Sequence, residues 1–401
     1  MGTKFKAITS GTVTSPQGFL AGAVKASIKS QEKLDLAILC FEKPCVAAGV
    51  FTTNAIKAAP VILSQKHLKN RSAQAIVVNS GYANACTGDS GMADAVEMAR
   101  SVAEKLGLSV EDVLVASTGV IGVPLPMDRV RAGIRKVALT KEGGHELASA
   151  MMTTDTFPKE MAIFVESKLG EFTIGGVAKG AGMIHPDMAT LLCFLTTDAA
   201  VEARFLQSAL QKAVDVSFNM ITIDGDTSPS DTVVILANGL AGTETINSRS
   251  GELFQKALDE VCLYLAKWVA RDGEGATKLI EVAVEGAVNE AQARLAARTI
   301  ASSLLFKAAI HGNDPNWGRI VAALGRSGAK VNERKLDVYL NDVCVMKQGS
   351  PVPFDRQEVS TGLASKEVSV RLYLNLGQGK AVAWGCDLSE EYVTINSAYT
   401  S

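Results

Sequence analysis

The sequence predicts an α/β protein, because short apolar runs alternate with segments of helical periodicity. Residues 75–80 (AIVVNS) and 113–118 (VLVAST) are apolar runs that end in polar turns, as buried strands do. Between them, residues 91–106 repeat apolar side chains on one face of a helix. A strand, a helix and a second strand predict layers of helices packed on sheets.

The rest of the chain continues this alternation. We expect a hairpin of strands over 162–167 and 172–179, which leads into a glycine-rich turn and then into a buried strand over 190–199. The same patterns predict strands over 220–226, 233–239, 335–342 and 369–377, and helices over 127–151 (interrupted near Gly143), 201–218, 251–270 and 293–312.

Composition bounds the class of protein. A chain of 401 residues is long enough for two or three units with their own cores. The net charge of -2 gives no reason to expect nucleic acid or a membrane as a partner, and no apolar run approaches the roughly 18 residues of a membrane helix. The 7 cysteines are scattered and form no CxxC pair. They read as reduced thiols, so we expect a cytoplasmic location and no structural zinc.

Residues 179–198 (KGAGMIHPDMATLLCFLTTD) are the most informative segment. They place the Ala189–Thr190 peptide bond between a glycine-rich turn and an apolar run. If that bond broke, Thr190 would combine a hydroxyl nucleophile with an α-amino base, whose unperturbed pKa is about 7.7–8.0. The alternative is a loop that enters a buried strand, with Thr190 as its first polar residue. The segment by itself favours the alternative.

Several other segments occur with it in a characteristic order along the chain. They are 35–40 (DLAILC), 79–88 (NSGYANACTG), 116–122 (ASTGVIG), 153–159 (TTDTFPK), 224–231 (DGDTSPSD), 271–278 (RDGEGATK), 312–320 (GNDPNWGRI) and 393–401 (VTINSAYTS). Together with 179–190 they resemble the ornithine acetyltransferase family, also called glutamate N-acetyltransferase, of arginine biosynthesis. The resemblance runs from near residue 12 to residue 401. Tyr82 and Asp187 depart from the usual residues, at positions without an assigned catalytic role.

The resemblance implies a sandwich of helices and mixed β-sheets, of the self-cleaving type with an N-terminal threonine nucleophile. It also implies an α chain of residues 1–189, a β chain of residues 190–401, and a smaller C-terminal α/β domain from about 280 to 401. Two α and two β chains would form a heterotetramer.

The resemblance assigns the site residues as well. Thr190 would be the nucleophile, and Thr118 with Gly119 would form the oxyanion hole. From the residues alone, Gly119 allows close backbone approach and Thr118 offers a hydroxyl, although an ordinary strand-to-loop turn would look the same. The substrate-binding positions implied are Thr156, Lys179, Thr190, Glu274, Asn396 and Ser401.

Other motif-like features are better interpreted as structural. Residues 88–91 (GDSG) mimic a protease loop but open a helix, and GGVAKG lacks the ending of a phosphate loop. The histidines show no metal-binding spacing. Asp224, Asp226 and Asp231 lack the pattern of a calcium loop, so we interpret them as turn caps.

The function implied is transfer of acetyl from N2-acetyl-L-ornithine to L-glutamate through an acetyl-Thr190 intermediate, without metal or prosthetic group. Acetyl-CoA is a second possible donor, which the resemblance slightly favours and the sequence leaves open. One alternative is a related self-processing aminopeptidase or amidase, which would pass the acyl group to water. Another is a non-catalytic binding protein on the same scaffold.

Overall fold

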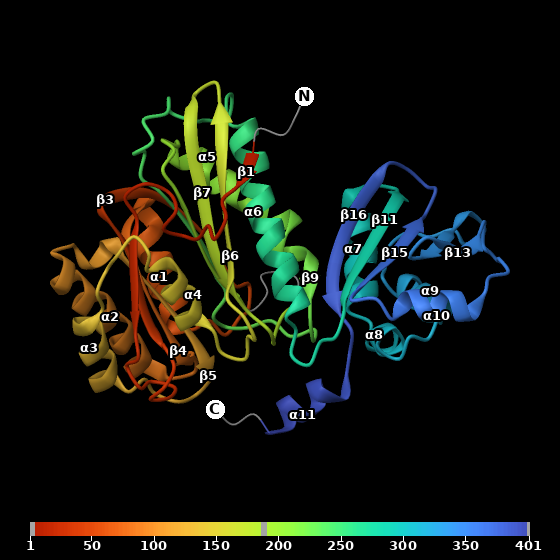
Figure 1. Ribbon diagram of the computed structural model, residues 1–401, viewed down its shortest axis with the longest axis horizontal. Helices are drawn as coiled ribbons and strands as arrows, with labels where there is room; N and C mark the ends of the chain where they lie inside the picture. The colour runs from red at the N-terminus through yellow and green to blue at the C-terminus, as the bar shows by residue number, and fades with distance from the viewer. Residues whose placement is uncertain (1–4, 186–190, 399–401) are drawn as a thin grey trace.

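The computed structural model describes residues 5–185 and 191–398, which form two sheets covered by helices (Figure 1). The larger sheet is mixed and has nine strands in the order β1-β6-β7-β8-β10-β3-β4-β5, with β2 paired to β3. Its strands are β1 (Phe5–Ala7), β2 (Leu20–Val24), β3 (Leu36–Phe51), β4 (Ser72–Tyr82), β5 (Val113–Val120), β6 (Lys159–Ser167), β7 (Gly170–Lys179), β8 (Leu192–Thr197) and β10 (Thr232–Ala237).

The larger sheet bends at β3 and so supplies both inner layers of a sandwich. The first half of β3 pairs with β4 and the second half with β10, and the register shifts between Cys40 and Cys45. Such bulges bend a strand. Phe194 of β8 packs in the same central cluster as Ile76 and Val78 of β4. The two halves of the sheet therefore share one core, and the predicted α/β sandwich is confirmed.

Helices cover the outer faces of this sandwich. The alternate β8 residues Cys193 and Leu195 pack against α5 and α6, whereas Val77 and Val115 pack against helices on the opposite side. Alternation along a strand sends neighbouring side chains to opposite faces, which explains the two separate outer clusters. The helices of this part are α1 (Ala59–His67), α2 (Gly88–Leu106), α3 (Met127–Lys136), α4 (Gly144–Met151), α5 (Ala203–Val216) and α6 (Glu252–Arg271).

The second sheet forms the right-hand body in Figure 1 and has seven strands in the order β14-β13-β12-β15-β11-β16-β9. The short β9 lies along the chain between α5 and β10 of the first body and pairs with β16 of the second, so it links the two bodies. The elements are β9 (Ile221–Thr222), β11 (Leu279–Ala287), β12 (Asp337–Leu340), β13 (Val343–Lys347), β14 (Ser350–Pro351), β15 (Glu367–Tyr373), β16 (Gly379–Cys386), α7 (Glu290–Ala301), α8 (Leu304–His311), α9 (Trp317–Gly325) and α10 (Arg356–Leu363).

The last helix, α11 (Glu390–Ala398), leaves the second body after β16 and lies below the junction of the two bodies (Figure 1). The hydroxyl of Ser389 donates to the carbonyl oxygen of Gly275 at 2.6 Å. Gly275 has φ +68, and a Cβ on it would come within 2.6 Å of the backbone nitrogen of Tyr392. This close approach requires glycine and seats α11 against the loop that follows α6.

Two predicted elements are wrong in extent. The strand predicted over 220–226 is limited to β9, because Asp224 turns the chain by accepting the N–H groups of Met183 and Ile184 at 2.5 and 2.9 Å. The single helix predicted over 293–312 is two helices, α7 and α8, because the chain becomes extended at Ser303.

The interruption expected near Gly143 separates α3 from α4. A Cβ at Gly143 would lie 1.8 Å from the carbonyl oxygen of Ala21, so the chain passes too close to β2 for any side chain. No helix of the described residues is long and apolar enough to span a bilayer. The predicted domain division at about residue 280 stays a prediction.

Candidate active site

A cavity of about 130 Å³ lies where the two bodies meet, and five of the predicted site residues line it. They come from the end of β5, the end of β7, the loop after α6, and α11. The five are Thr118, Gly119, Lys179, Glu274 and Asn396. The fold thus brings together side chains that are widely separated along the chain.

The remaining predicted residues are not at this cavity or not described. Ala189, Thr190 and Ser401 lie outside the described residues. Thr156 lines a different cavity, of about 470 Å³, together with Asp272. Its N–H donates to Asp272 at 3.0 Å and its hydroxyl donates to the same carboxylate, so both hydrogen-bond donors of Thr156 are engaged within the protein.

The end of β5 has the backbone conformation that only glycine adopts easily. Gly119 has φ +130, and a Cβ there would lie 2.2 Å from the carbonyl carbon of Gly81 on the parallel strand β4. Next to it, the Thr118 hydroxyl oxygen accepts a hydrogen bond from Lys179 Nζ at 3.4 Å. Because an accepting hydroxyl keeps its own proton available, Thr118 can still donate into the cavity.

Lys179 carries a buried positive charge beside Thr118. Its Nζ donates to Thr153 Oγ1 at 2.8 Å and lies 3.8 Å from Asp155 Oδ2. Burial lowers the pKa of Lys179, while the neighbouring Asp155 carboxylate acts in the opposite direction. A cation held at this position can bind a carboxylate or stabilise negative charge that develops on a reacting oxygen.

A second buried lysine, Lys159, forms ion pairs with two buried carboxylates next to the site. Lys159 Nζ lies 2.7 Å from Asp155 Oδ1 and 2.6 Å from Asp272 Oδ2, and all three side chains are almost completely buried. Asp155 also accepts the N–H of Gly180 at 2.6 Å. Burial alone would raise the pKa of Asp155, but the ammonium groups of Lys179 and Lys159 hold it well below its usual range.

The sequence interpretation missed this ion-paired cluster. Asp155 and Lys159 lie within TTDTFPK and Asp272 within RDGEGATK, two of the segments that carried the resemblance. A signal was therefore present, but nothing in the spacing showed that residues more than a hundred positions apart would pair.

Glu274 and Asn396 form the opposite side of the cavity. Asn396 Nδ2 donates to Glu274 Oε2 at 2.8 Å. The Glu274 carboxylate lies against the glycine-rich turn, since a Cβ on Gly182 would be only 2.6 Å from its carboxyl carbon. A carboxylate in this place can accept hydrogen bonds from a substrate ammonium group.

A narrow space beside the start of β8 adjoins this cavity and shares residues with it. It is lined by Thr118, Lys179, Leu191, Leu192, Ser230 and Asp231. Asp231 accepts the N–H of Leu191 at 3.1 Å, and its main-chain neighbour Thr232 donates to the Leu191 carbonyl oxygen at 3.0 Å. Asp231 was interpreted as a turn cap, but it is fully buried at the site, whereas Asp224 does cap a turn.

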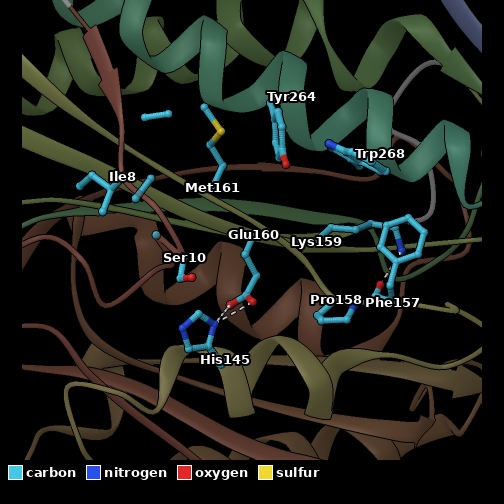
Figure 2. Close-up of a pocket in the computed structure, with 13 residues that line it drawn as sticks. Ile8, Ser10, His145, Phe157, Pro158, Lys159, Glu160, Met161, Tyr264 and Trp268 are labelled. Carbon is cyan, nitrogen blue, oxygen red and sulfur yellow. Dashed lines mark hydrogen bonds and ion pairs between the residues drawn. The ribbon is translucent and has the colours of Figure 1, made fainter.

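A larger cavity, of about 610 Å³, is lined in part by Lys159 of the ion-paired cluster but shares no lining residue with the two spaces described above. Figure 2 shows His145 and Glu160 on one of its sides and Tyr264 and Trp268 on another. The Glu160 carboxylate is already engaged, because it accepts hydrogen bonds from Thr12 at 2.6 Å and pairs with His145 at 2.9 Å. We do not assign this cavity to the reaction.

Side chains that commonly bind metal ions do not cluster in the described residues. These residues contain no group of three or more His, Cys, Asp or Glu side chains arranged to hold a metal ion. The seven cysteines are free thiols, and Cys86 is the exposed one among them.

Comparison with known proteins identifies close relatives. The chain matches the ArgJ family over residues 20–401. It is 55% identical over 395 residues to the arginine biosynthesis bifunctional protein ArgJ of Dehalococcoides mccartyi, with 98% of each chain covered, and 54% identical over 395 residues to the protein of the same name from Symbiobacterium thermophilum, with 97% and 98% covered. Among solved structures it is similar to the arginine biosynthesis bifunctional protein argJ of Bacillus halodurans, with 45% identity and a TM-score of 0.50. That match covers 51% of this chain and 97% of the solved one.

Proposed function

The chain belongs to the ArgJ family, and from this premise we propose that it is a self-processing acetyltransferase of arginine biosynthesis. It moves an acetyl group from N2-acetyl-L-ornithine to L-glutamate. The observation that carries the proposal is the convergence of Thr118, Gly119, Lys179, Glu274 and Asn396 around one cavity. Thr118 and Lys179 also line the space at Leu191, which directly follows the proposed nucleophile in the chain.

Processing comes first. The Thr190 hydroxyl attacks the carbonyl carbon of Ala189, the acyl group shifts from nitrogen to oxygen, and water hydrolyses the resulting ester. The products are an α chain ending at Ala189 and a β chain beginning with Thr190. The solved chain from Bacillus halodurans supports this, because almost all of it corresponds to about half of this chain.

Acetyl transfer then uses Thr190 as a covalent carrier. Its hydroxyl attacks the acetyl carbonyl of N2-acetylornithine, and its α-amino group takes the proton and passes it to the departing amine. The Thr118 hydroxyl and the Gly119 N–H donate to the oxyanion. Lys179 binds the substrate carboxylate and Glu274 the ammonium group. L-Glutamate then accepts the acetyl group by the reverse sequence.

The same proposal covers the cofactors, the second acetyl donor, the assembly and the location of the enzyme. No metal or prosthetic group takes part, because the nucleophile, the base and the oxyanion donors all come from the chain. Acetyl-CoA is proposed as a second donor, and the word bifunctional in the names of the relatives supports this. Two α and two β chains would assemble as a heterotetramer in the cytoplasm, with Thr156 and Ser401 as further substrate contacts.

The proposal has a direct test. Thr190→Ala should remain a single chain by mass spectrometry, whereas the unsubstituted protein should give two chains. The mature enzyme should transfer acetyl from N2-acetylornithine to labelled glutamate without CoA, with parallel lines in double-reciprocal plots. Release of acetate without N-acetylglutamate would identify a hydrolase instead. An intact, active protein with an uncut Ala189–Thr190 bond would contradict self-processing.

A further inference from the structure

A buried carboxylate, Asp387, joins the two chain segments that carry Glu274 and Asn396. Its Oδ1 accepts the N–H groups of Thr277 and Lys278, both at 2.8 Å, and its Oδ2 accepts the Thr277 hydroxyl at 2.6 Å. Its own N–H donates to the Lys278 carbonyl oxygen at 3.3 Å. Thr277 lies in the same loop as Glu274. Asp387 lies just before α11, the helix of Asn396, so these bonds tie that helix to that loop.

His311, the last residue of α8, holds the same carboxylate from a third side. Its Nδ1 lies 2.7 Å from Asp387 Oδ2, and its Nε2 lies 3.2 Å from Glu390 Oε2 on α11. The Asp387 side chain is completely buried, whereas that of Glu390 is largely exposed. Burial alone would raise the pKa of Asp387, but hydrogen bonds, from Thr277 first and then from His311, hold it below its usual value. An ionised carboxylate only accepts hydrogen bonds, so His311 Nδ1 carries the hydrogen between the two side chains.

Lys278 extends this network to the segment that follows His311. Its buried Nζ donates to the Ile310 carbonyl oxygen at 2.6 Å and to Asn313 Oδ1. Asn313 belongs to 312–320 (GNDPNWGRI), one of the segments that carried the resemblance and for which the mechanism above has no use. The carbonyl groups of the last turn of a helix have no partner within the helix, so the ammonium group caps α8 and fixes it to the loop of Glu274.

We propose that Asp387 and His311 are positioning residues, which hold the loop of Glu274 against α11 so that this carboxylate can bind the side-chain ammonium group of N2-acetylornithine. The inference rests on the proposed function, in which Glu274 accepts that ammonium group. Asn396 of α11 donates to Glu274 at 2.8 Å, so the loop and the helix must keep a fixed spacing. Asp387 and His311 are not among the described residues that line the cavity, so they act through Glu274 and not on the reacting atoms.

This role predicts an effect on only one of the two substrates. N2-Acetylornithine carries an ammonium group on its side chain, whereas glutamate carries a carboxylate there. In a ping-pong reaction, kcat/KM for each substrate reports the half-reaction of that substrate alone. Displacement of Glu274 therefore lowers kcat/KM for N2-acetylornithine and leaves kcat/KM for glutamate unchanged, whereas general damage to the site would lower both values.

The main test is His311→Leu, which removes the hydrogen bond to Asp387 but keeps a side chain of similar size. In the mature enzyme, kcat/KM for N2-acetylornithine should fall by roughly 2- to 10-fold, the contribution of one hydrogen bond, and kcat/KM for glutamate should not change. His311→Asn places an N–H group where Nδ1 lies and should restore most of the loss. His145→Leu is the matched control, because His145 also pairs with a carboxylate, Glu160 at 2.9 Å, but lines the cavity that is not assigned to the reaction. The control should keep both values.

A second variant, Asp387→Asn, covers the case in which His311→Leu fails to fold. It keeps an oxygen for the N–H groups of Thr277 and Lys278 but replaces the oxygen that faces His311, so the same selective loss is expected. The loss in either variant should not add to that in Glu274→Gln, because both changes act on one ammonium contact.

The inference is overturned if the folded variants lose kcat/KM equally for both substrates or lose none. It is overturned as well if neither variant folds, because the pair would then serve the stability of the fold. If the unsubstituted mature enzyme transfers no acetyl from N2-acetylornithine, the proposed function itself fails, so the two failures are distinguishable.

Discussion

Two buried polar clusters flank the candidate site, and they differ in how completely their groups are paired. In the first, Lys159 bridges Asp155 and Asp272, and each carboxylate also accepts backbone N–H groups. In the second, Ser230 Oγ and Asp231 Oδ2 have no partner among the described residues. Both clusters are buried, so exposure does not explain the difference.

The paired groups fix the positions of the elements around the site, whereas the groups without partners remain able to take part in a reaction. A buried ion pair contributes little net stability but ties its elements in one arrangement, because losing one partner is costly. Lys159 does this for the loop before β6 and the end of α6. A buried group without a partner among the described residues is costly as it stands and needs an explanation.

The largest expected effect breaks the paired cluster. Lys159→Ala should lower the free energy of unfolding by about 3–5 kcal/mol, because it leaves two buried carboxylates without their cation. Urea unfolding followed by circular dichroism measures this. Lys256→Ala is the control, since Lys256 pairs with Glu252 at 2.6 Å on the surface. An exposed pair contributes about 0–1 kcal/mol, so equal losses for the two variants would contradict the structural role of Lys159.

The second prediction concerns a group that is free to donate. Thr118→Ala should reduce kcat by about 10²–10³ with little change in KM, because the hydroxyl acts on charge that develops in the transition state. Steady-state kinetics of acetyl transfer measures this. Thr118→Ser keeps the hydroxyl and should retain most of the activity. An unchanged kcat in Thr118→Ala would remove this side chain from the oxyanion hole.

The sequence predicted the layered fold well where periodicity was strong, as for β7, β8, α5 and α6. It did not predict the bend in β3 that turns one sheet into a sandwich, because the bend depends on pairing with two different strands. The split between α7 and α8 was missed for a related reason. The run of apolar residues continues across Ser302 and Ser303, so periodicity alone gave no signal to stop.

The candidate site also shows that local sequence patterns do not reveal long-range pairing. The resemblance supplied Thr118, Lys179 and Glu274, which the fold brings to one cavity. Asp231 was interpreted as a turn cap, because aspartate in a glycine- and serine-rich segment usually is one. Its burial follows from the pairing of β10 with β8 and β3, which no local pattern could reveal.

The third prediction compares one carboxyl from each cluster through the pH dependence of stability. The pKa of Asp155 is lowered on folding, so its stabilisation is present above about pH 3.9 and is lost as the pH falls through the folded value. The pKa of Asp231 is raised on folding, so stability falls as the pH rises above about 3.9 toward the folded value. The two contributions therefore have opposite signs.

This prediction is measured in the uncleaved Thr190→Ala background by urea unfolding between about pH 3 and 7. Adding Asp155→Asn should lower the free energy of unfolding by an amount that grows as the pH rises through the acid range. Adding Asp231→Asn should lower it by an amount that shrinks over the same range, or should raise it. Each slope can reach about 1.4 kcal/mol per pH unit for one group. Slopes of the same sign would contradict the contrast between the clusters.

The smallest expected effect lies at the exposed edge of the site, where neither cluster reaches. Asn396 is exposed and donates to Glu274 at 2.8 Å, so it steadies the carboxylate that is proposed to bind the substrate ammonium. A hydrogen bond of this kind contributes about 0.5–1.5 kcal/mol, so Asn396→Ala should raise KM by roughly 2- to 10-fold and leave kcat nearly unchanged. Ser397→Ala is the control, because its hydroxyl donates to Thr394 within the same helix. If Asn396→Ala lowered kcat as strongly as Thr118→Ala, Asn396 would act on the transition state. The assignment of Asn396 as a residue that only positions Glu274 would then be wrong.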